Sequence, residues 1–173
     1  MLAVLIDTLV WSEVKTAGKS PCPRERHSMT NVGGKLYVFG GLSKASEFMN
    51  DLYSLDLMTL RWTSLKFLHV PVPRNHHAAV SIDEKLYIIG GKSQHGYFND
   101  VHCFDESLKQ WSQPHIETMC PAGRWGHNAV SIGHRIIIFG GWNGTWCFDD
   151  LHCYDTSKMD LQRYETRKRA IIV

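Results

Sequence analysis

The 173-residue sequence lacks an excess of charge of either sign, because 19 lysines and arginines oppose 17 aspartates and glutamates, for a net charge of +2. This balance gives the chain no general attraction for nucleic acid or for an acidic membrane surface. The one basic cluster stands at the end of the chain, in residues 163–169, and is typical of a solvated tail. We therefore expect neither nucleic acid nor a membrane among the partners.

A secretory signal, a membrane-spanning run and an even number of cysteines are also lacking. The apolar opening MLAVLIDTLVW has no basic segment before it, contains Asp7 and is too short to cross a bilayer. Five cysteines are an odd number, which favours free thiols in a reducing compartment. We therefore expect a cytoplasmic protein, with a nuclear location as the alternative.

The usual sequence marks of an enzyme are missing as well. No Ser/His/Asp order and no phosphate-binding glycine loop stands out. His102-Cys103 and His152-Cys153 are adjacent pairs, but neighbouring residues of a strand point to opposite faces and cannot easily bind one ion. The other cysteines share no metal-like spacing: Cys22, Cys120 and Cys147. These patterns predict no metal, no cofactor and no catalytic activity.

What the sequence does contain is a unit that repeats every 50 residues. Each copy has an Arg-x-x-His segment, then an apolar run that ends in a glycine pair, then two aspartates. The first two copies continue to a tryptophan, where the third has Leu161. The repeated residues are Arg24, His27, Gly40, Gly41 and Trp62; Arg74, His77, Gly90, Gly91 and Trp111; and Arg124, His127, Gly140 and Gly141.

Each copy also contains four short strand-like runs separated by polar or glycine-containing connections. The run before each glycine pair, KLYVF, KLYII or RIIIF, is apolar on both of its alternating faces and must be covered on both sides. A four-stranded antiparallel sheet with two buried faces is typical of a propeller blade between neighbouring blades.

The repeated residues resemble the kelch repeat, and the Arg-x-x-His start resembles kelch proteins such as host cell factor and the Rab effectors more than the BTB-kelch adaptors. The resemblance covers roughly residues 21–161. It implies an all-β, kelch-type β-propeller with about three four-stranded antiparallel blades and one extra N-terminal strand. This would be a partial ring.

The repeat predicts five segments. Residues 1–20 are expected to be the outer strand of a preceding or closing blade, with its connection. Residues 21–69, 70–118 and 119–166 are the three expected blades, the last with a degenerate final strand, and residues 167–173 are the basic tail. A partial ring leaves three possibilities open: a piece of a longer product, self-association, or a truncated form.

Comparison of the copies separates architecture from function, since every blade needs its structural residues while a partner contacts particular ones. The recurring arginines and histidines are therefore interpreted as architecture. The alternative is a ring of cations that binds an acidic peptide or a C-terminal carboxylate. The first aspartate of each copy, Asp51, Asp100 or Asp150, is expected to cap backbone N–H groups.

The loops between the second and third strands (b–c loops; 42–49, 92–98 and 142–148) are expected on one face with the connections between blades. Their recurring phenylalanines are expected to pack on the sheet, and their other residues to bind a partner. The candidates are Arg26, Lys44, His76, His95, Tyr97, Trp125, Trp142, Asn143 and Trp146. This pattern predicts a scaffold or substrate-recruiting module that binds a peptide or loop. The alternatives are a kelch-fold enzyme (oxidase, isomerase or specifier-like) and a truncated product without function.

Overall fold

The computed structural model describes residues 2–5, 10–116, 120–158 and 160–164. The regular elements of these residues are sixteen β-strands. This part of the chain contains no helix with the length and apolarity that a membrane span requires. The predicted basic tail, residues 167–173, lies outside the described residues.

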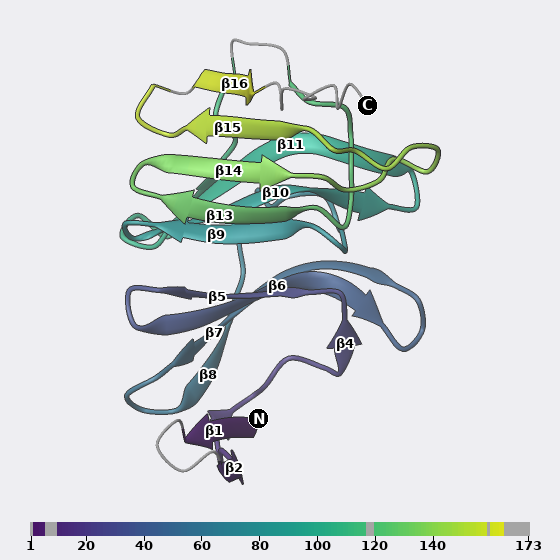
Figure 1. The fold of residues 1–173 in the computed structure, drawn as a ribbon. Coiled ribbons are helices and arrows are strands. Elements are labelled where there is room, and N and C mark those ends of the chain that lie inside the picture. Colours follow the sequence, from purple (N-terminus) through teal and green to yellow (C-terminus); the bar gives the residue numbers. More distant parts are fainter. Residues whose placement is uncertain (1, 6–9, 117–119, 159, 165–173) are drawn as a thin grey trace.

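Three antiparallel four-stranded units follow one another along the chain (Figure 1). Blade 1 consists of β5 (Ser28–Val32), β6 (Lys35–Ser43), β7 (Phe48–Asp56) and β8 (Arg61–Leu65). Blade 2 consists of β9 (Ala78–Ile82), β10 (Lys85–Ser93), β11 (Gly96–Asp105) and β12 (Gln110–Ser112). Blade 3 consists of β13 (Asn128–Ile132), β14 (Arg135–Phe139), β15 (Leu151–Asp155) and β16 (Asp160–Tyr164). The predicted all-β propeller fold is confirmed.

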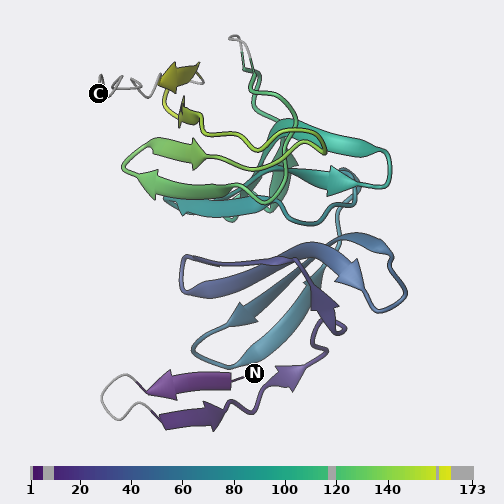
Figure 2. The ribbon, with the colours of Figure 1, turned by 45° about the vertical axis from the view of Figure 1, so that its right-hand side comes forward.

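The N-terminal region differs from the single strand that we expected in residues 1–20. β1 (Leu2–Leu5) and β2 (Val10–Glu13) form an antiparallel pair, and β3 (Ala17–Gly18) runs parallel to β8. Figure 2 shows this pair of strands at the blade 1 end of the molecule. Only Trp11 of this region matched the repeat, so the comparison of copies gave no indication of the second strand of the pair.

The glycine pairs lie inside long strands in blades 1 and 2, whereas the sequence suggested that they end them. β6 and β10 continue past the glycines, with a shift of register at the pair. A Cβ on Gly90 would lie 2.9 Å from the His127 ring and 3.0 Å from the Arg124 carbonyl oxygen. The pair is therefore a bulge at which the next blade approaches the first glycine, and the Arg-x-x-His segment of the same blade approaches the second, too closely for a side chain.

Apolar side chains fill the space between successive blades. Tyr37, Phe39 and Leu52 of blade 1 pack with Ile88 and other residues of blade 2. A second cluster joins blades 2 and 3 in the same way. The last strand of blade 3 is present despite its degenerate sequence, because buried Leu161 replaces the tryptophan of the other blades.

The outer face of blade 3 is uncovered in the described chain. Val130, Ile132 and Phe139 are 54%, 66% and 52% exposed. Their counterparts one repeat earlier are buried against blade 3, and Ile82 and Ile89 are only 6% and 5% exposed. Blade 3 therefore presents to solvent the kind of face that blades 1 and 2 bury.

We expect this face to cause self-association of the purified 173-residue chain, because contiguous exposed apolar area favours association. The double variant Ile132→Lys/Phe139→Lys should lower the average mass in light scattering across a concentration series. Leu68→Lys, which changes a 97% exposed apolar residue elsewhere, is the matched control and should have no effect. A wild-type chain that is monomeric at every concentration would contradict this expectation.

Candidate functional site

Each recurring arginine joins three parts of its blade. The Arg74 guanidinium donates to the carbonyl oxygens of Val72 and Gly90, and to both carboxylate oxygens of Asp100 at 2.6 and 2.9 Å. The Phe98 ring covers the same guanidinium at 4.1 Å, a contact that the sequence did not predict. The other two blades repeat the pairing through Arg24 with Asp51 and Arg124 with Asp150.

These pairs correct the role expected for the first aspartate of each copy, which binds the arginine instead of capping backbone N–H groups. Burial alone would raise the pKa of Asp100, but hydrogen bonds from Arg74 and His102 hold it well below its usual range. The hydrogen bond from Arg124 lowers the pKa of Asp150 in the same way. The arginine charges are thus neutralised within the blades, which argues against the alternative of a cation ring.

Two of the recurring histidines, His77 and His127, are buried between blades. The Nε2 atom of His77 is 2.8 Å from the Oγ atom of Ser28 in blade 1, and its ring packs 5.4 Å from Phe39. Burial, reinforced by the charge of Arg74, lowers the pKa of His77 to about 3. Burial and the charge of Arg124 lower that of His127 to about 4. Both histidines are therefore held neutral in the folded protein at ordinary pH.

The b–c loops and the Arg-x-x-His segments meet on one face, as predicted, which we call the loop face. In blade 1, β4 (Arg24–Glu25) pairs with the end of β6. Asn75 pairs with Lys92 in blade 2, and Trp125 pairs with Trp142 in blade 3. The loops are shorter than expected in the first two blades, where residues 44–47 and 94–95 connect the strands, because the ladder continues beyond the glycines.

Trp125 lies at the centre of an aromatic and cationic cluster on this face. The Lys92 ammonium lies 4.4 Å from the centre of the Trp125 ring, the His76 ring is 4.5 Å away, and the Trp142 ring meets it edge-on at 5.3 Å. Burial and the nearby charges of Arg26 and Lys92 lower the pKa of His76. Trp125 therefore supports Trp142, which remains 37% exposed.

The b–c loop of blade 3 holds a second tryptophan outward. The Asn143 side-chain oxygen accepts hydrogen bonds from the backbone N–H groups of Thr145 and Trp146, at 3.0 and 2.8 Å. This tight turn leaves Trp146 68% exposed. The Tyr97 ring lies so close to Gly144 that no Cβ would fit there, and it braces the turn from blade 2. Tyr97 therefore has a structural role and remains 43% exposed.

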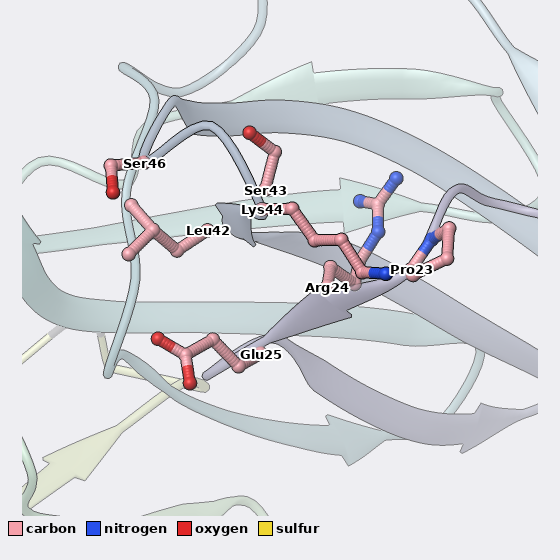
Figure 3. Close-up of a pocket in the computed structure, with 7 residues that line it drawn as sticks. All are labelled: Pro23, Arg24, Glu25, Leu42, Ser43, Lys44 and Ser46. Carbon is pink, nitrogen blue, oxygen red and sulfur yellow. The ribbon is translucent and has the colours of Figure 1, made fainter.

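The remaining candidates border two hollows between the loops. Lys44 helps to line a cavity of about 390 Å³ in blade 1 (Figure 3). Its walls are Pro23, Arg24, Glu25, Leu42, Ser43, Lys44 and Ser46. His95 lines a cavity of about 370 Å³ between blades 1 and 2, which shares Ser46 with the first. The two hollows therefore adjoin on the loop face.

Lys92 is the main residue that sequence reasoning missed. It directly follows a glycine pair, where the other copies have Leu42 and Trp142, so its variation between copies was the available signal. Among the described residues, no group of three or more His, Cys, Asp and Glu side chains could hold a metal ion.

The fold and its repeated arginine–aspartate pairs define a kelch-type propeller. The sequence model of the family described as the KLHDC2/KLHL20/DRC7 Kelch-repeats domain matches residues 1–171, so the chain belongs to this kelch-repeat family. Kelch repeats of this kind form protein-interaction propeller domains.

Several characterised proteins are similar to the chain. It is 40% identical over 119 residues to the Acyl-CoA-binding domain-containing protein 4 of Arabidopsis thaliana, covering 68% of this chain and 18% of that protein. It is 44% identical over 59 residues to the Kelch domain-containing protein 2 of Bos taurus, covering 34% and 14%. It is 39% identical over 71 residues to the Host cell factor of Drosophila melanogaster, covering 34% and 5%. The chain thus spans less than a fifth of each of these relatives, and the predicted resemblance to host cell factor is confirmed.

We expect Arg74→Ala to destabilise the protein by about 3–5 kcal/mol, because it leaves the Asp100 carboxylate partly buried without its cation. Arg24→Ala is the matched control and should cost less, since Asp51 is 37% exposed and can be hydrated, against 19% for Asp100. Chemical denaturation monitored by tryptophan fluorescence measures both. Equal losses in the two variants would contradict the proposed importance of burial.

The buried histidines should make the protein less stable as the pH falls. Below about pH 6.5 the unfolded chain binds protons that the folded state cannot accept until about pH 4 for His127 and about pH 3 for His77. The wild-type protein should lose free energy of unfolding between pH 7 and pH 5. In His127→Gln this loss should be smaller by about 2 kcal/mol. An unchanged slope in His127→Gln would refute the assignment.

Proposed function

We propose that this chain is a scaffold or substrate-recruiting module that binds a peptide or loop of another protein on the loop face. The observation that carries the proposal is the exposure of Trp142 and Trp146 on a rigid support in blade 3. Tryptophan is among the residues that dominate the energy of protein interfaces, because its large ring loses much water-exposed apolar area on binding.

The support beneath these tryptophans favours binding because it limits the entropy lost on association. Trp142 rests against Trp125, which is in turn covered by Lys92 and His76. The Asn143 turn fixes the backbone of Trp146. Side chains that are already ordered lose little conformational freedom when a partner arrives. A partner segment with large apolar or aromatic side chains fits this surface best.

The two adjoining hollows extend the proposed surface toward blade 1. Their walls combine Ser43, Ser46 and Ser93 with apolar and charged side chains, and Lys44 and His95 are among the lining residues. An extended segment that contacts the tryptophans can continue across them and place its side chains in the hollows. No specific observation in the described residues favours the alternative of a kelch-fold enzyme.

The proposal predicts that Trp142→Ala and Trp146→Ala each weaken, by at least tenfold, the binding of peptides selected on the wild-type chain from a random phage-displayed library. Fluorescence polarisation of the labelled peptides measures the affinity. Thermal unfolding should change little in Trp146→Ala, since this side chain is 68% exposed.

Leu108→Ala is the matched control, because it truncates a 70% exposed apolar residue in the turn between β11 and β12. It should bind the selected peptides as the wild type does. A folded chain that selects no peptide, or peptides that bind both tryptophan variants normally, would refute the proposal and would favour a product without this function.

A further inference from the structure

Arg26, His76 and Gly126 occupy the same position in the three blades, two residues after the recurring arginine. All three have a left-handed backbone, with φ values of 58°, 51° and 68°. This conformation is natural for glycine, but it brings the Cβ of other residues too close to the backbone. Blade 3 thus has the residue that the backbone prefers, and blades 1 and 2 do not.

Contacts between blades impose this backbone conformation. The N–H group of His76 donates to the carbonyl oxygen of Arg26 at 3.1 Å, and that of Gly126 donates to the carbonyl oxygen of His76 at 3.0 Å. These bonds link the first strands of successive blades. The strain at Arg26 and His76 therefore follows from the propeller, and a glycine at either position would relieve it.

The other non-glycine residues with positive φ have a local explanation. Ser46, Leu60, Asp83 and Lys109 lie between consecutive strands of one blade, where the chain must reverse direction. Arg26 and His76 lie instead beside the first strand of the blade, facing the loops. Chain reversal does not account for either residue.

The Arg26 side chain contributes little to the fold. It forms an ion pair with Glu25 at 3.2 Å, in which the two side chains are 42% and 60% exposed. An exposed pair of this kind adds little stability. His76 contacts Trp125 and Asn75, and so borders the aromatic cluster of the loop face. Both strained side chains lie where the partner is proposed to bind.

We propose that Arg26 and His76 are partner-contacting residues whose side chains are kept at a cost to stability that Gly126 avoids. This inference rests on the proposed function and extends it to the segments that precede β5 and β9. The Arg26 guanidinium can only donate hydrogen bonds, so the partner group that faces it is an oxygen acceptor, either a backbone carbonyl or a side-chain carboxylate.

The test compares Arg26→Gly with Arg26→Ala in the full chain. Both variants remove the side chain, but only glycine relieves the backbone, so Arg26→Gly should raise the melting temperature by about 2 °C and Arg26→Ala should not. Both should weaken the binding of the library-selected peptides at least fivefold. His76→Ala should weaken the binding of these peptides similarly.

Gly126→Ala provides the reciprocal control, since a Cβ there would meet no atom within 4 Å and adds only strain. It should lower the melting temperature by about 2 °C and leave peptide binding unchanged. Replacing Asp and Glu of the selected peptides by Asn and Gln distinguishes a carboxylate acceptor from a backbone carbonyl. A loss of affinity that depends on Arg26 identifies a carboxylate. Unchanged affinity identifies a backbone carbonyl.

Two results would overturn the inference alone: peptides that need Trp142 and Trp146 but bind Arg26→Gly and His76→Ala normally, or a lower melting temperature in Arg26→Gly. The first would leave the proposed function intact and confine the contact to blade 3. The second would show that the Arg26 side chain stabilises the fold. Failure to select any peptide would instead refute the proposed function itself.

Discussion

The ion pair between a buried arginine and the first aspartate of each repeat is the interaction on which the rest of the blade depends. A guanidinium can be taken out of water only if its charge and its donors are all satisfied. In blade 2 the partners of Arg74 are Asp100 and the carbonyl oxygens of Val72 and Gly90. One side chain therefore fixes the start of the blade, its glycine pair and its third strand relative to one another.

The repeat predicted most of the fold because it recorded interactions that every blade needs. The blades and the shared loop face both follow from residues that recur at one spacing. The partner of Arg74 was missed, since Asp100 is 26 residues away and the sequence does not show which polar groups meet in space. The strand β1 was missed for a different reason: it has no counterpart of the repeated residues within the described chain.

The candidate site could be predicted only in part, because variation between copies marks a position without showing its surroundings. Trp125 varies between copies and was expected to contact a partner, but three neighbours surround its ring and make it a support for Trp142. Lys92 was not among the candidates, because the sequence shows only that it follows a glycine pair. Its place over Trp125 depends on the pairing of Asn75 with Lys92, which only the structure shows.

The Tyr97 ring of blade 2 packs against Gly144 of blade 3, so the b–c loops of these two blades are in direct contact. A conformational change in one loop would be transmitted to the other through the tyrosine ring. The two loops therefore form one surface for a partner. Because most of this surface is ordered when the protein folds, a partner binds it with little further rearrangement. New specificity would then arise more readily from exchanging side chains on this surface than from lengthening either loop.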